Sequence, residues 1–274
     1  MRAAARGDRA ALGQAIAVRQ RVGDLSESEA AALARTVADR ELRGTAERDA
    51  VERIRDARPC ARELDDALAD AMRSRGPAGA EAGLARIDAH RLGLDDARAY
   101  AADPDGGWRA LGARALVRPE DGAARRRALL DPDPRVRREA ARAARDAAEG
   151  ADLNALAEAA RVDPVPIVRS EAVRAIAALP APADGRVANV LRDLWTSGDE
   201  GLKEDVALAW ASPQGWAGGG REALRVVAAS GHGSAAVEAA AAILRHRDAD
   251  ADTQQAASGQ LSRAIEGGPS VVRR

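Results

Sequence analysis

Three segments of the chain align with one another without gaps, and this repetition limits the fold more than any other feature. The segments begin at Asp103, Asp131 and Asp163, so their starts lie 28 and 32 residues apart. Counting this Asp as position zero, each has Pro at +1, a large apolar residue at +5, Arg at +6, a small residue at +9, Arg at +11 and Ala at +12. A unit this short buries its apolar stripe only against its neighbours, so we expect the units to stack.

Each copy continues with the periodicity of a helix, and shorter helical segments lie between the copies. Weaker copies begin at Ser197 and cover residues 234–244. No segment shows the sustained alternation of apolar and polar residues that is typical of a strand. The pattern therefore predicts a unit of helix, Asp-Pro turn and helix, in which positions +5, +9, +12, +13 and +16 form the core. The shorter helices are expected at residues 123–130, 153–161, 187–195 and 221–229.

The residues of the turn have distinct expected roles. The Asp at position zero is expected to accept hydrogen bonds from the free amides that begin the second helix. Pro fixes φ and prevents the preceding helix from continuing. The guanidinium at +6 can reach the carboxylate of its own turn or of the adjacent one.

This combination resembles HEAT repeats, including the bacterial form known as PBS-lyase HEAT-like. The resemblance is strong over about residues 95–180, weaker to about 250, and not demonstrable before about 75. It implies an all-α fold, a right-handed α-α superhelix of stacked antiparallel helix pairs. In that family a turn Asp and the Arg six residues later form a ladder between neighbouring units. The matching positions here are Asp103 and Arg109, Asp131 and Arg137, and Asp163 and Arg169.

The repeat pattern predicts two regions. Residues 1–75 form an N-terminal helical region, either a cap or degenerate repeats, in which Ser26 and Glu29 have the spacing of a capping box. Residues 76–274 form the repeat region. Its last residues, 267–274, look like the opening of another repeat, so we expect the chain to be a fragment or to have a frayed end.

Composition and motifs argue against several functional classes. The formal net charge of −1 gives no overall footprint for nucleic acid or for an anionic membrane. Cys60 is the single cysteine, which excludes an intrachain disulfide and is expected to be an inert buried thiol. The histidines His90, His232 and His246 fit no metal-binding spacing, no catalytic motif is recognisable, and no cofactor is predicted. No signal peptide or membrane span is visible, so a cytoplasmic location is the default, or export if the N-terminus belongs to a fragment.

Arginines at equivalent positions are the first candidates for partner binding. Stacked units would bring the +11 residues Arg114, Arg142 and Arg174 into a column, and Arg138 and Arg145 would widen it. One interpretation is a basic strip for an acidic peptide, an acidic protein face or phosphate groups. The other is a solvated face whose arginines are balanced by neighbouring acids, namely Glu139, Asp146 and Glu171.

Further arginines and the tryptophans have simpler expected roles. The run from Arg125 to Arg127 is interpreted as the charged outer face of a first helix. Trp216 lies in a glycine-rich linker, where it is either an exposed contact residue or folded back onto the solenoid. The other tryptophans, Trp108, Trp195 and Trp210, are expected in the core.

Three functions are compatible with the sequence. The first is a non-catalytic scaffold that binds a protein partner on its concave helical surface. The second, implied by the resemblance, is an enzyme or enzyme subunit similar to HEAT-like DNA glycosylases or phycobilin lyases. The near-zero net charge and the scattered aromatic residues disfavour DNA binding. The third is a structural segment of a larger protein.

Overall fold

The structure is a computed structural model, and it describes residues 62–75, 78–180, 185–230, 234–246 and 249–267. All regular secondary structure in these ranges is helical. The expected features of residues 1–61, among them the capping box at Ser26 and the thiol of Cys60, lie outside the described residues, as does the expected fraying of residues 268–274. The chain forms two compact units, Met1–Leu116 and Val117–Arg274, and each is described by itself. The expected division at residue 75 stays a prediction.

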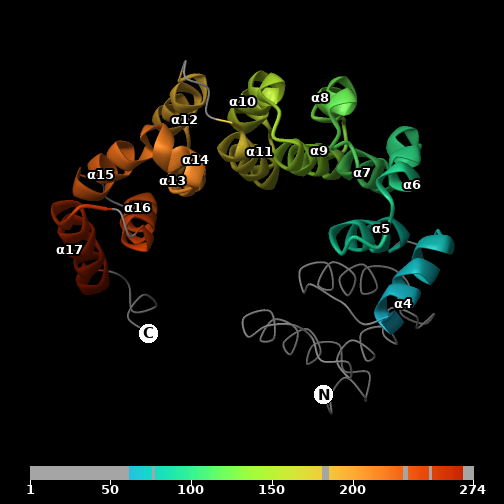
Figure 1. Cartoon of the computed structure of the whole chain (residues 1–274), viewed down its shortest axis with the longest axis horizontal. Helices are drawn as coiled ribbons and strands as arrows, with labels where there is room; N and C mark the ends of the chain where they lie inside the picture. Colours follow the sequence, from blue (N-terminus) through green and yellow to red (C-terminus); the bar gives the residue numbers. More distant parts are fainter. Residues whose placement is uncertain (1–61, 76–77, 181–184, 231–233, 247–248, 268–274) are drawn as a thin grey trace, which may run out of the picture. The chain divides into compact units, whose positions relative to one another are not determined.

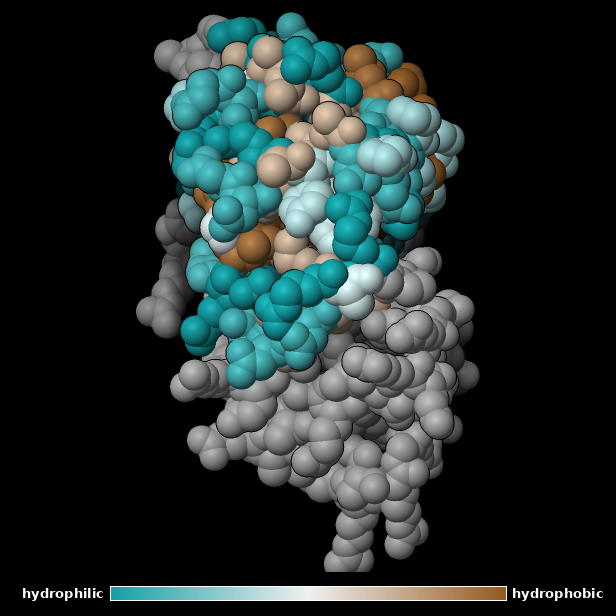
Figure 2. All heavy atoms as spheres, turned by 90° about the vertical axis from the view of Figure 1, so that its right-hand side faces the viewer, coloured by the Kyte–Doolittle hydropathy of each residue, from teal (hydrophilic) through white to brown (hydrophobic). Residues whose placement is uncertain are grey.

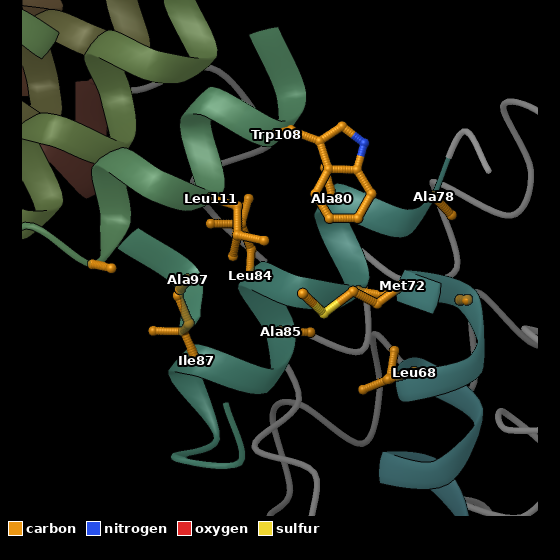
Figure 3. Close-up of a cluster of buried hydrophobic side chains, with 13 residues drawn as sticks. Leu68, Met72, Ala78, Ala80, Leu84, Ala85, Ile87, Ala97, Trp108 and Leu111 are labelled. Carbon is orange, nitrogen blue, oxygen red and sulfur yellow. The ribbon is translucent and has the colours of Figure 1, made fainter. Parts of the chain in front are cut away.

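The described part of the first unit consists of short helices that pack around leucine, alanine and one tryptophan. The helices are α4 (Arg62–Arg73), α5 (Gly79–Asp88), α6 (Leu94–Arg98), the 3-10 turn η3 (Ala99–Ala102) and α7 (Gly106–Arg114). Leu68, Leu84 and Leu111 are almost fully buried. Figure 3 shows these residues with Trp108 and Met72 in one cluster contributed by α4, α5 and α7. Because most of the other members are alanine, the backbones can approach closely.

The second unit contains helix pairs at the places that the repeat predicts. Its elements are η4 (Pro119–Asp121), α8 (Gly122–Ala128), α9 (Pro134–Ala147), η5 (Gly150–Asp152), α10 (Leu153–Val162), α11 (Pro166–Ala178), α12 (Arg186–Ser197), α13 (Glu200–Trp210), α14 (Pro213–Gly215), the π-turn η6 (Trp216–Gly220), α15 (Arg221–Ser230), α16 (Ser234–Arg245) and α17 (Ala251–Gly267). The second helices of the pairs, α9, α11, α13 and α16, pack against one another in chain order. The first helices, α8, α10, α12 and α15, each pack against the second helix that follows (Figure 1).

The buried positions of the second helices follow the expected offsets. Val136, Ala140, Ala143 and Ala144 are buried on α9, and the equivalent residues of α11 are Val168, Ala172, Ala175 and Ile176. On α16 the buried residues Ala235, Ala239, Ala242 and Ile243 fit the same offsets when residue 230 is counted as zero. The sequence shows only a weak copy at residues 234–244, and its position zero comes from the structure because the turn before α16 lacks the Asp-Pro pair.

The glycine-rich segment before α15, which was expected to be a linker, forms a kinked turn between α14 and α15. It forms one π-turn, in which Gly219 has a φ of +99° and Gly218 also leaves helical geometry. Glycine adopts this φ without the steric cost that a side chain adds. The segment also passes close to the end of α13, where a Cβ on Gly220 would lie 2.5 Å from the carbonyl oxygen of Trp210. The glycines thus allow a tight connection from α13 to α15.

Candidate functional site

The arginine at +6 makes two sets of contacts, which join its own turn to the next one. Nη1 of Arg137 donates to the carbonyl oxygens of Asp131 and Pro132, at 2.9 and 3.1 Å. Its Nε and Nη2 donate to the carboxylate of Asp163, at 2.6 and 3.0 Å. These hydrogen bonds raise the pKa of the Arg137 guanidinium. One side chain therefore closes its own turn and connects it to the following turn.

Arg169 repeats both sets of contacts, and the turn at Asp103 repeats part of them. Arg169 donates to the carbonyl of Asp163 at 3.0 Å and to the carboxylate of Asp199 at 2.8 Å. In the first unit, Arg109 donates to the carbonyl of Asp103 at 3.0 Å, and the carboxylate of Asp103 accepts from Arg75 at 2.7 Å. The hydrogen bond from Arg75 lowers the pKa of the Asp103 carboxyl. The six residues of the expected ladder thus lie at the turns.

The first Asp of the motif does not cap the second helix, which differs from the expectation. Asp103, Asp131 and Asp163 each accept the backbone amide two residues later, at 3.0, 2.9 and 2.9 Å. The carboxylate at position +2 makes the capping bond instead: Asp105 accepts from Gly107 and Trp108, and Asp133 accepts from Arg135. The first Asp lies two residues too far from the helix, so it holds the turn, and the helix amides bond to the second Asp in the copies that have one; α11, which begins after Val165, has no side-chain cap.

Loss of the ladder arginine should weaken the second unit. We expect Arg137→Ala to lower the local free energy of unfolding of α9 and α11 by about 2 kcal/mol, because it leaves the buried Asp163 without this charged donor. Hydrogen exchange of peptides from α9 and α11 measures this value. Arg135→Ala is the matched control, since the ion pair of Arg135 with Asp133 is partly exposed and its loss should cost less than about 0.5 kcal/mol. Equal losses for the two variants would contradict the role of the ladder.

The second helices share one unburied face. Residues at +4, +7, +11 and +14 lie on the same side of a helix, opposite the core positions, and on α9, α11, α13 and α16 none of them is buried. We call this set the graded face. Its residues are Arg135, Arg138, Arg142 and Arg145 on α9; Ile167, Ser170, Arg174 and Ala177 on α11; Gly201, Glu204, Leu208 and Ala211 on α13; and Ser234, Val237, Ala241 and Leu244 on α16. Its chemistry changes from basic on α9 to apolar on α16.

Acidic residues lie beneath the basic end of the graded face, at position +8. The side chains of Glu139, Glu171 and Asp205 are only 2%, 6% and 11% exposed. Arg142 lies 3.6 Å from Glu139. Arg174 lies 3.3 Å from Glu171 and 3.5 Å from Asp205. Arg142 and Arg174 are thus paired with acids that lie under the face instead of beside them in solvent. Which of the two interpretations of the arginine column holds stays a prediction.

The candidate arginines differ in what they present to solvent. The side chain of Arg174 is 47% exposed, whereas that of Arg142 is 19% exposed. Within the described part of the chain, Arg138 forms no ion pair, and its Nε is buried without a hydrogen-bond partner. Arg114 belongs to the first unit, where it is buried and its Nε donates to Asp88 at 3.1 Å. The exposure expected for Arg114 is therefore absent, because a carboxylate of α5 holds it in the interior.

Trp216 is folded back, which is one of its two expected positions. Its ring stacks on the imidazole of His246 with a centroid distance of 3.9 Å and an interplanar angle of 5°. The histidine in turn lies 2.7 Å from the carbonyl oxygen of Ala211 through Nε2. Trp108 and Trp210 are buried, as expected of core residues, and Trp195 is half-buried against Trp210. Trp216 is therefore half-buried against the end of α16.

The arginine run on α8 does not form a uniform outer face. Arg125 is completely buried; its Nε donates to Asp152 at 2.6 Å and its Nη2 to Glu149 at 3.0 Å. Arg126 lies 3.0 Å from the same Asp152, while Arg127 is exposed. The expected solvated face is thus wrong for Arg125, because the buried carboxylate of Asp152 at the start of α10 compensates its charge.

Other features of the described residues are less suited to a ligand. A hollow of about 60 Å³ lies between α12 and the π-turn, lined by Leu191, Trp210 and Gly219 among others. Among the described residues, no group of His, Cys, Asp or Glu side chains has an arrangement that could hold a metal ion. No helix in the described ranges is long and apolar enough to cross a membrane. Hydrophilic residues cover most of the described surface drawn in Figure 2.

Comparisons with known proteins do not assign the chain to a family. No family model matches it, and no curated protein matches it. It is similar to a crystal structure of an engineered protein, with 21% identity and a TM-score of 0.41, over 90% of this chain and 72% of the other. A second engineered protein has 22% identity and a TM-score of 0.36, over 80% of this chain and 97% of the other. Likeness at this level carries no argument about function.

Proposed function

We propose that the chain is a HEAT-like scaffold without catalytic activity, which binds a protein partner through its second helices. In this proposal the helix pairs stack antiparallel into a right-handed α-α superhelix, and the second helices line its concave surface. The observation that supports it most directly is the graded face, where the same four positions stay unburied on each of α9, α11, α13 and α16. Because these helices pack in chain order, the unburied positions form one continuous surface.

The ladder supports the same proposal. Arg137 and Arg169 each tie their own turn to the next, which connects neighbouring second helices through their turns. A surface made of helices held in this way is organised before a partner arrives, so little conformational entropy is lost on binding. Exposed apolar residues on the graded face, Ile167, Leu208 and Leu244, are of the kind that contact surfaces bury.

Site-specific photo-crosslinking tests this function. A photoreactive phenylalanine at position 208, on the graded face, should give discrete protein adducts in cells that make the protein. Leu208 is 40% exposed, so the replacement leaves the core unchanged. The matched control is position 158 on α10, where the side chain of Glu158 is 61% exposed on a first helix. Equal adducts from the two positions, or none from position 208, would refute the proposed surface.

A further inference from the structure

The residues of the graded face change from basic at α9 to apolar at α16, and this change specifies the kind of partner that the face fits. At the α9 end all four positions are arginine, and at the α16 end Val237, Ala241 and Leu244 occupy three of the four. The helices between them are intermediate, since α11 carries Arg174 beside Ile167, and α13 carries Leu208 beside Glu204. A partner that covers the whole face therefore meets guanidinium groups on one side and aliphatic groups on the other.

The basic end is accessible as positive charge even though acids balance it. Glu139 and Glu171 lie beneath the face, where a partner cannot reach them, while the guanidinium of Arg174 extends to solvent. The ion pairs of Arg142 and Arg174 measure 3.3–3.6 Å, longer than the roughly 2.7–2.9 Å of strong charge-assisted hydrogen bonds. The exposed guanidinium of Arg174 can therefore also meet an incoming carboxylate. The acids at or beside this surface include Asp146 at the edge of the basic half, and Glu200, Glu204 and Glu238 on α13 and α16, outside that half.

The size of the face favours a segment over a folded domain. Positions +4 to +14 of one helix span roughly 15 Å. Neighbouring helices lie about 8–10 Å apart, so the row from α9 to α16 spans roughly 25–30 Å. The resulting area of about 400 Å² is half of the roughly 800 Å² that each partner contributes to a standard protein–protein interface. An extended segment of about eight to ten residues is long enough to cross the row.

Resting on the proposed scaffold function, we infer that the graded face binds an extended protein segment that has an acidic block followed or preceded by an apolar block. The acidic block lies over α9 and α11, where its carboxylates pair with Arg138 and Arg174. The apolar block lies over α13 and α16, where it covers Leu208 and Leu244. The two blocks contribute in different ways, since the ion pairs are weakened by salt and the apolar contacts are not.

A fluorescent ten-residue peptide tests this inference. The probe has four glutamates, a Gly-Ser spacer and four leucines, and its affinity for the full chain is measured by fluorescence anisotropy at several salt concentrations. One comparison peptide has lysines in place of the glutamates, and another has serines in place of the leucines. We expect the mixed probe to bind at least about tenfold more tightly than either comparison peptide, because each loses one block of contacts.

Paired variants locate the two blocks on the chain. Arg138→Gln with Arg174→Gln should weaken binding of the probe about five- to tenfold and flatten its salt dependence. Leu208→Ser with Leu244→Ser should weaken it by a similar factor and leave the salt dependence unchanged. Arg127→Gln on α8 and Val226→Ser on α15 are the matched controls, since both residues are exposed and lie outside the graded face. Circular dichroism confirms that each variant retains its helix content.

The outcomes separate the inference from the function on which it rests. Three results would each overturn the inference. The control variants could weaken binding of the probe as much as the paired variants do, or the lysine peptide could bind as tightly as the mixed probe. A DNA duplex could also displace the probe at the same concentration of charge. Crosslinks at position 208 without binding of the mixed probe would overturn the partner chemistry and leave the scaffold function intact. Binding of the probe with the expected variant pattern supports the inference, and absence of crosslinks at position 208 would still refute the scaffold function.

Discussion

Asp152→Ala should lower the local free energy of unfolding around α8 and α10 by about 3–5 kcal/mol. Both Asp152 and Arg125 are fully buried, and the pair joins two helices that are far apart in the sequence. Removing the carboxylate leaves the guanidinium of Arg125 in the interior without its shortest charged contact, while the longer contact to Glu149 and the hydrogen bond to the carbonyl oxygen of Arg118 remain. An uncompensated buried charge costs far more than the loss of a surface ion pair. Hydrogen exchange of peptides from α8 and α10 measures the effect.

Two variants distinguish the free-energy cost of an uncompensated buried charge from the cost of losing side-chain contacts. Arg127→Ala changes an exposed arginine of the same helix and should cost less than about 0.5 kcal/mol. Arg125→Met combined with Asp152→Leu removes both charges together and should recover most of the loss, because apolar residues of similar volume often replace a buried pair without penalty. A loss below about 1 kcal/mol for Asp152→Ala would show that Arg125 is compensated in another way.

Gly112→Ala should destabilise the first unit by about 3 kcal/mol, the upper end of the range for overpacking. Gly112 occupies position +9 on α7, where the backbone of η3 lies directly against it. A Cβ at this position would lie 2.6 Å from the carbonyl carbon of Tyr100 and still closer to the backbone nitrogen of Ala101. Backbone atoms cannot rotate away as a flexible side chain can, so α7 and η3 must separate. Exchange of amides in α7 reports the loss.

The control for this prediction is Gly150, a glycine that lies at the start of the 3-10 turn η5. A Cβ on Gly150 would have no atom within 4 Å, so Gly150→Ala should change stability by less than about 0.5 kcal/mol. Trp108 is a buried residue of α7 and the single tryptophan of the first unit, so its emission adds a second measure. If the Gly112→Ala variant were as stable as the Gly150→Ala variant, the backbones of α7 and η3 could not be in direct contact at Gly112.

Features that depend on local sequence could be predicted. The shorter helix expected at residues 153–161 is α10, Leu153–Val162, because apolar periodicity and the following Asp-Pro turn define both ends. The core offsets of α9 and α11 also follow from the sequence, since a helix of known phase has only one apolar side. These offsets placed Arg142 and Arg174 away from the core. The partner that they bind stays a prediction.

Features that depend on a distant partner required the tertiary structure. Arg125 and Arg127 are equivalent in the sequence, but only Arg125 faces Asp152, 27 residues later in the chain, and is buried. Arg114 was expected on a surface, but it is buried, where it forms an ion pair with Asp88 of α5. The apolar end of the graded face was missed because α16 has no Asp-Pro turn to fix its phase. The sequence by itself determined where helices form and which side of each is apolar, since both depend on residues a few positions apart. Only the packing of the helices decided which charges are buried, because the free energy of a charge depends on the groups that surround it in space.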